Sequence, residues 1–189
     1  VGVDATDSVV ERGRRRTTEE GLADRVRFVL ADVCDSGLPA AGADFVWAED
    51  AWCYVKDKPR LIREAARVVR SGGTIAFTDW VEGPVGLTSA ESDRFLAFMK
   101  FPTLESVPGY SRLLAQSGCR VEAAEDTGRF PAYMDLYMSM LDMQLTYDAL
   151  RILAFDMATM EMLAGEMTFL RELAHAGKVA QGRFVARKE

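Results

Sequence analysis

The sequence predicts an α/β fold, in which helices flank a mostly parallel β-sheet. Short apolar runs alternate with amphipathic helical stretches over the first two-thirds of the chain, which is the pattern of strands joined by helical crossovers. Each of these apolar runs stops at an acidic residue. The composition fits a folded domain, because 49% of the 189 residues are hydrophobic and 28% are charged.

The predicted strands are short runs rich in branched and aromatic residues. Those of the first part cover residues 1–3, 26–30, 43–48 and 74–78, and they end at Asp4, at Asp32, at Glu49 and Asp50, and at Asp79. Open parallel sheets bind ligands beyond the carboxyl ends of their strands. Four acidic strand ends in series therefore predict a binding site along one edge of the sheet.

Helices are predicted between and after these strands. The early ones cover 6–21, where Asp7 or Ser8 can cap the helix, and 57–69, which the glycines of 71–73 end. Later segments predict helices over 88–100 and 110–117, a strand over 120–125, a methionine-rich helical stretch over 135–177 and a last strand over 182–187. We expect a single domain, 1–189, in which 131–178 is a helical insertion that serves as a lid.

Charge and composition exclude several classes of function. The net charge of −6 is spread along the chain, which argues against a nucleic-acid partner, and no apolar run approaches the ~20 residues that cross a bilayer. The three cysteines form no CxxC pair and there is one histidine, so the sequence predicts no metal site. The odd cysteine count and the lack of a signal peptide favour a cytoplasmic setting.

Two of the acidic strand ends suit a nucleoside. A carboxylate at the position of Asp4 can accept hydrogen bonds from both hydroxyls of a ribose. Asp32 can accept from an adenine amino group, while the backbone N–H that follows it, at Val33, donates to a ring nitrogen. Taken singly, each aspartate is better explained as a structural residue, such as a helix cap or a solvated turn. Their order and spacing favour the joint interpretation, with Ala5 and Ala31 as flanking contacts.

The sequence resembles the Rossmann-like (class I) S-adenosylmethionine-dependent methyltransferases. The matching stretches are 1–4 (VGVD), 24–32 (DRVRFVLAD), 43–47 (ADFVW) and 64–79 (EAARVVRSGGTIAFTD). Within that family the chain is most similar to sarcosine/dimethylglycine methyltransferases, through 49–54, 110–118, 176–178 and 182–188. The resemblance implies S-adenosylmethionine as cofactor, a small-molecule methyl acceptor such as a glycine derivative, and an antiparallel last strand.

The resemblance also shows two departures. The family's first strand and its glycine-rich loop are absent, and the chain opens directly on the strand that ends at Asp4. We therefore expect about 60–80 further N-terminal residues in the natural protein, and weak or no cofactor binding without them. Many relatives have a histidine where this chain has Tyr54, so a general base there is a different group or is not needed.

Candidate residues for the chemistry follow the later strands. Methyl transfer from a sulfonium needs positioning and exclusion of water, and aromatic faces stabilise methylated cations. The candidates are Trp52, Tyr54, Trp80 and Tyr110, with Asp79 as a partner for the acceptor and with Glu49 and Asp50 beside the ammonium of the cofactor. The alternative for each is ordinary packing or a solvated loop.

Other interpretations of the same patterns stay open. The methionine-rich stretch fits a plain helix core, an adaptable pocket wall, or an oligomer face such as that of a homodimer. An acidic strand end also suits NAD, so an NAD(P)-binding oxidoreductase is the second hypothesis. A truncated, non-catalytic remnant that acts as a binding module is the third.

Overall fold

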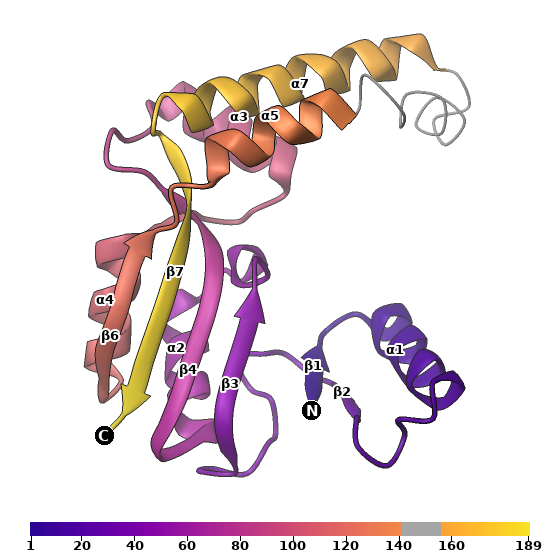
Figure 1. Ribbon diagram of the computed structural model, residues 1–189, viewed down its shortest axis with the longest axis vertical. Helices are drawn as coiled ribbons and strands as arrows, with labels where there is room; N and C mark the ends of the chain where they lie inside the picture. Colours follow the sequence, from indigo (N-terminus) through magenta and orange to yellow (C-terminus); the bar gives the residue numbers. More distant parts are fainter. Residues whose placement is uncertain (141–155) are drawn as a thin grey trace.

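The computed structural model of the chain describes residues 1–140 and 156–189. A four-stranded sheet with one short added strand has helices packed against it, and a helical layer lies above it (Figure 1). A separate pair of short strands lies beside the sheet, with one helix of its own. The predicted α/β class is confirmed.

The main sheet has the strand order β3-β4-β7-β6. Its members are β3 (Ala43–Glu49), β4 (Val69–Glu82), β7 (Val179–Lys188) and β6 (Cys119–Asp126), and β5 (Glu105–Ser106) pairs with the end of β4. β3 and β5 run parallel to β4, while β7 runs antiparallel to both β4 and β6. The expected antiparallel last strand is therefore present.

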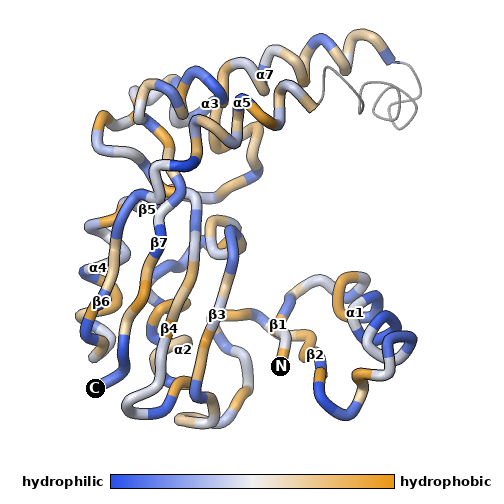
Figure 2. Tube along the Cα trace, viewed as in Figure 1, coloured by the Kyte–Doolittle hydropathy of each residue, from blue (hydrophilic) through white to orange (hydrophobic). Residues whose placement is uncertain are grey.

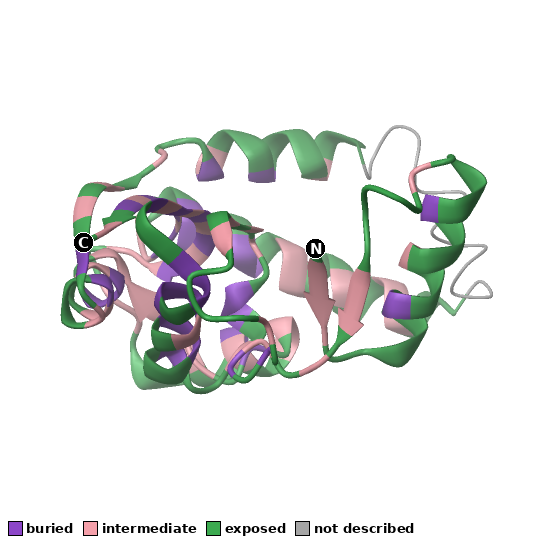
Figure 3. Cartoon of the chain, turned by 90° about the horizontal axis from the view of Figure 1, so that it is seen from below, coloured by how far each residue is buried: buried purple, intermediate pink, exposed green. Residues whose placement is uncertain are grey.

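The core lies between this sheet and the helices α2 (Lys58–Val68) and α4 (Val107–Gln116). Alternate residues of β4 point into it, and Ile75, Phe77 and Val81 are buried. Hydrophobic residues lie along the strands of the main sheet (Figure 2), and the buried residues gather along the contact between sheet and helices (Figure 3). On β3, by contrast, Phe45 and Trp47 are 54% and 68% exposed.

The N-terminal unit consists of β1 (Gly2–Asp4), α1 (Asp7–Glu19) and β2 (Phe28–Leu30), with β1 parallel to β2. The ring of Phe28 fills the space over two glycines, since a Cβ atom at Gly2 or at Gly13 would lie 2.8 Å from that ring. These glycines let α1 and β1 approach β2 closely. Among the described residues, β1 pairs only with β2, and β3 pairs only with β4.

The upper helical layer contains α3 (Ser89–Met99), α5 (Phe130–Met140) and α7 (Met157–His175). Thr88 caps α3 in a reciprocal capping box with Glu91. The helices enclose a second apolar cluster that includes Phe95, Phe101 and Phe130. Residues 141–155, within the predicted insertion 131–178 and with Met143 among them, lie outside the described residues; the lid stays a prediction.

The strand expected over 74–78 is longer at both ends, since β4 begins at Val69, and its far end matters for the site. The strand continues to Glu82, so Asp79 and Trp80 lie within β4 and not beyond its end. Asp79 pairs with Gly182 of β7 in the ladder. Its side chain falls on the buried face with Phe77 and Val81.

Candidate functional site

A cavity of about 910 Å³ lies between the N-terminal unit and the main sheet. The carboxyl ends of β1, β2 and β3 all reach it, and α2 closes one side. The predicted site residues in its lining are Asp4, Ala5, Asp32, Val33, Asp50, Trp52 and Tyr54. The structure thus brings most of the predicted site together, from segments up to 50 positions apart in the sequence.

Asp4 and Asp32 have the same local arrangement. Oδ1 of Asp4 accepts a hydrogen bond from the N–H of Thr6 at 2.8 Å, and Oδ1 of Asp32 accepts one from the N–H of Cys34 at 2.8 Å. The second oxygen of each carboxylate makes no hydrogen bond within the described part of the chain. Each side chain therefore fixes its own turn and still offers one acceptor to the cavity, so the capping and ligand interpretations are compatible.

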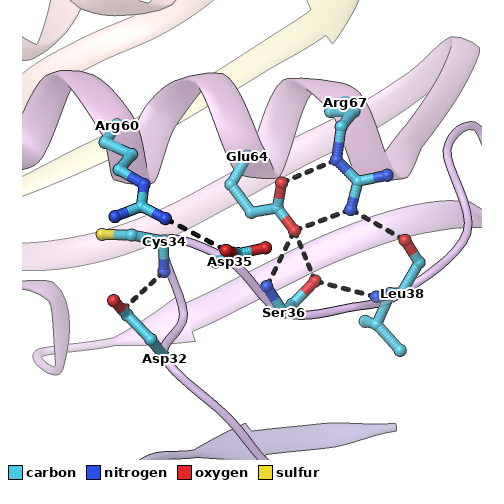
Figure 4. A network of polar contacts seen from close by, with 8 residues as sticks. All are labelled: Asp32, Cys34, Asp35, Ser36, Leu38, Arg60, Glu64 and Arg67. Atoms are coloured by element: carbon cyan, nitrogen blue, oxygen red, sulfur yellow. Dashed lines mark hydrogen bonds and ion pairs between the residues drawn. The ribbon is translucent and has the colours of Figure 1, made fainter.

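The loop that follows Asp32 is held by a charged network on α2 (Figure 4). Oε1 of Glu64 accepts hydrogen bonds from the N–H of Ser36 at 3.0 Å and from its hydroxyl at 2.5 Å. Arg67 donates to both oxygens of Glu64 and to the carbonyl of Leu38 at 2.7 Å. The Arg67 guanidinium lowers the pKa of Glu64 to about 2, so this carboxylate stays charged at neutral pH.

Asp50 has an unusual backbone and an unsatisfied carboxylate. It adopts a left-handed conformation with φ of 47° directly after β3, and its N–H donates to the carbonyl of Thr78 at 2.9 Å. Oδ2 accepts from Nε2 of Gln181 at 2.7 Å. Oδ1 is buried and has no hydrogen-bond partner among the described residues. Unsatisfied buried oxygens are costly and recur at functional sites.

Two predicted cofactor contacts do not line the cavity. The N–H of Ala31 donates to the carbonyl of Asp4 at 3.0 Å, which extends the pairing of β1 and β2. Glu49 is an exposed residue at the end of β3 and is absent from the cavity wall.

Asp79 and Trp80 are also absent from the cavity wall, so their predicted contact with the acceptor stays a prediction. Asp79 is fully buried; Oδ1 accepts from the N–H of Cys53 at 2.8 Å and Oδ2 from the hydroxyl of Tyr110 at 2.6 Å. Burial raises the pKa of Asp79. Trp80 packs edge-on against Phe130, with 4.6 Å between ring centroids, under the upper helices.

The aromatic candidates that do line the cavity come from one short turn, the 3-10 helix η1 (Trp52–Tyr54). Trp52 is buried and packs on Phe77, with 4.1 Å between ring centroids. Tyr54 is 59% exposed and packs edge-on against Phe101 at 5.0 Å. Tyr110, the remaining aromatic candidate, is fully buried and packs in the core.

Sequence reasoning missed Gln181 and Lys58. Gln181 donates a hydrogen bond to a residue far away in the sequence, and Lys58 donates to backbone carbonyls. No local sequence pattern indicates either contact. Among the described residues, no group of three or more His, Cys, Asp or Glu side chains is placed to hold a metal ion. No described helix is long and apolar enough to cross a membrane.

Comparison of the sequence with known proteins shows which family the chain is similar to. Residues 1–77 match the family model of a methyltransferase domain. Over 132 residues, 68% of its length, the chain is 33% identical to 27-O-demethylrifamycin SV methyltransferase of Amycolatopsis mediterranei and covers 48% of it. These two matches support a class I methyltransferase. The chain spans about half the length of this curated relative, since the match covers 48% of it.

Two further comparisons fit this methyltransferase assignment. The chain is 34% identical over 87 residues to a sarcosine/dimethylglycine N-methyltransferase of Halorhodospira halochloris, covering 44% of this chain and 31% of the relative. A crystal structure from Galdieria sulphuraria, assigned provisionally as a sarcosine dimethylglycine methyltransferase, superposes with a TM-score of 0.83 at 20% identity. The superposition covers 99% of this chain and 68% of that one, and shows the shared fold.

Proposed function

We propose that this chain supplies most of the site of an S-adenosylmethionine-dependent methyltransferase that acts on a small molecule. The observation that carries the proposal is the convergence of three carboxylates, Asp4, Asp32 and Asp50, on one cavity at the carboxyl ends of three strands. The family match over residues 1–77 supports it, because that segment contains all three.

The residues of the cavity fit such a cofactor. The free oxygen of Asp4 would accept from the ribose hydroxyls, and Asp32 with the N–H of Val33 would hold the adenine. Asp50 has a carboxylate oxygen that lacks a donor, and the ammonium of the methionine portion would supply one after a small rotation of the side chain.

The bound cofactor would supply a methyl group that is already activated on a sulfonium. The chain would then position the two reactants and exclude water. Trp52 and Tyr54 border the same cavity and offer aromatic surface for a methylated cation. We infer an amine acceptor of the glycine-derivative class, supported by the similarity to sarcosine/dimethylglycine N-methyltransferases.

The proposal includes a further strand between β1 and β3. Both strands leave one edge unpaired among the described residues, and both border the cavity. The exposure of Phe45 and Trp47 on β3 fits the crossover helix that would accompany such a strand, because the faces of parallel sheets are usually covered by helices. Such a strand would end in the glycine-rich turn that approaches the methionine portion of the cofactor.

Calorimetric titration of the chain with S-adenosylmethionine, S-adenosylhomocysteine and NAD tests the function. A second protein, extended at Val1 by a strand, a glycine-rich turn and a crossover helix, tests the missing-strand proposal. We expect the extended protein to bind both sulfur nucleotides more tightly than the 189-residue chain does. Binding of NAD alone would favour an oxidoreductase, and the absence of any binding to either protein would leave a non-catalytic module.

A further inference from the structure

A buried lysine and a buried aspartate hold the turn η1 from opposite sides. The ammonium of Lys58 donates to three backbone carbonyls, those of Trp52 at 2.7 Å, Cys53 at 3.2 Å and Val55 at 2.6 Å. Asp79 accepts the N–H of Cys53 at 2.8 Å. The peptide group between Trp52 and Cys53 is therefore bound at both ends, its N–H by the carboxylate of Asp79 and its carbonyl by the ammonium of Lys58.

Both charged groups are withdrawn from solvent, with Lys58 3% exposed and Asp79 fully buried. Isolated buried charges are strongly unfavourable, so such groups persist where their hydrogen bonds are satisfied. Here the donors of Lys58 bind the turn, and the second oxygen of Asp79 accepts the hydroxyl of Tyr110 at 2.6 Å. These contacts fix the backbone of η1 more firmly than an ordinary surface turn.

The turn fixed in this way presents two of the aromatic side chains that line the cavity, Trp52 and Tyr54. Trp52 is wedged against Phe77, while Tyr54 leaves most of its ring exposed. An aromatic face attracts a cation only at the right distance and angle. A backbone held by Lys58 and Asp79 would keep those faces in a constant position.

We propose that Lys58 and Asp79 are positioning residues that hold the η1 aromatic pair for recognition of a positively charged sulfonium. The inference rests on the proposed function and adds how the cavity distinguishes the charged methyl donor from its neutral product. S-adenosylmethionine and S-adenosylhomocysteine share the adenosine and differ in the methyl group and its charge. Loss of the fixed turn would thus change the ratio of the two affinities and leave binding of the adenosine portion in place.

The test is calorimetric titration of the purified chain and its variants with both nucleotides. We expect wild type to prefer S-adenosylmethionine by about three- to tenfold, as a cation–π contact predicts. In the double variant Lys58→Met/Asp79→Asn, which removes both charges together, the ratio should fall close to one while affinity for S-adenosylhomocysteine changes less than about twofold. A matched control, Arg70→Met/Asp44→Asn, removes an exposed ion pair of 2.6 Å outside the cavity wall and should keep the wild-type ratio.

A second pair of variants keeps the inference testable if the double variant does not fold, as judged by far-ultraviolet circular dichroism. Tyr54 is exposed, so Tyr54→Ala should fold and lose part of the preference, whereas Tyr54→Phe keeps the ring and the preference. A retained ratio in Tyr54→Ala, or in the folded double variant, would overturn the inference. Equal binding of both nucleotides by wild type would also overturn it and leave the proposed function standing, while binding of neither nucleotide by this chain and by the extended protein would remove both.

Discussion

The side-chain amide of Gln181 donates a hydrogen bond to Oδ2 of Asp50 at 2.7 Å, although 131 positions separate the two residues. The contact links β7 to the loop that follows β3, across the intervening strand β4. The carbonyl oxygen of the same amide accepts the hydroxyl of Thr127 at 3.3 Å. Gln181 therefore joins the cavity wall to the segment that leads into α5.

The substitution Gln181→Leu should destabilise the protein by about 1–2 kcal/mol, because it leaves the carboxylate of Asp50 without a donor on either oxygen. Urea unfolding followed by circular dichroism measures the change. The control Thr127→Val removes the longer contact of the same amide and should cost less than about 1 kcal/mol. Equal stability of Gln181→Leu and wild type would show that water replaces the hydrogen bond to the carboxylate of Asp50.

The sequence was sufficient to predict the order of strands and the acidic strand ends, since both depend on local patterns. The end of the strand at Asp79 was predicted wrongly, because a charged residue usually ends a strand and β4 continues to Glu82. Asp79 is nevertheless in phase with Ile75, Phe77 and Val81 on the buried face. The partners that make this burial tolerable, the N–H of Cys53 and the hydroxyl of Tyr110, come from other elements.

Other parts of the site depend on tertiary contacts that no local pattern contains. Lys58 is the first residue of an amphipathic helix, where a lysine normally reaches into solvent, yet it turns back to three carbonyls. Gln181 lies in a strand and bonds to a loop far away in the sequence. The two cofactor contacts that the structure places off the cavity, Ala31 and Glu49, were inferred from adjacency in sequence and not from the face of the strand.

Neutralising Asp4 tests its role as a ribose ligand. Asp4→Asn keeps the acceptor for the N–H of Thr6 and loses the charge. If the carboxylate binds two hydroxyls, affinity for S-adenosylhomocysteine should fall by about tenfold or more, as the loss of charged hydrogen bonds implies. Calorimetry provides the measurement, and Asp7→Asn, a nearby acidic residue outside the cavity lining, is the control. Unchanged affinity would remove Asp4 from the site.

The network on α2 predicts a pH-dependent stability. Glu64 has its pKa lowered to about 2 in the folded chain, so its hydrogen bonds stabilise the fold above the ordinary carboxyl pKa and are lost as the pH falls from about 4.5 towards 2. Glu64→Gln should thus reduce the free energy of unfolding at pH 7 by on the order of 2 kcal/mol. The difference from wild type should shrink between pH 5 and 3. Urea unfolding across this range checks it, and a gap that stays constant with pH would contradict it.

The exposed apolar surface of β3 predicts self-association or dye binding. Trp47 is 68% exposed, so Trp47→Lys should change the free energy of unfolding by less than about 0.5 kcal/mol. The variant should bind less of the apolar dye ANS and elute as a smaller species in size-exclusion chromatography. The matched change in the core, Phe184→Ala, should cost about 3–5 kcal/mol. An unchanged ANS signal would place the exposed apolar surface elsewhere.

The cysteines should be unreactive in the folded chain. All three, Cys34, Cys53 and Cys119, are free and buried. Burial raises the pKa of Cys34 to about 11 and also raises the pKa of Cys53 and Cys119. Iodoacetamide at pH 8, followed by mass spectrometry, should label native protein slowly and urea-unfolded protein at all three sites. Rapid labelling of one site in the native protein would show local opening there.

The unpaired edges of β1 and β3 also have a consequence for cooperativity. Among the described residues, the three-residue strands β1 and β2 share a ladder only with each other, whereas β4 is paired on both sides over 74–78 and 81–82. Two short strands contribute little stability on their own. Backbone amides of β1 and β2 should therefore exchange with deuterium long before those of β4 and β7, as a separate unfolding unit. The part of the chain that carries Asp4 and Asp32 would then be the first to open.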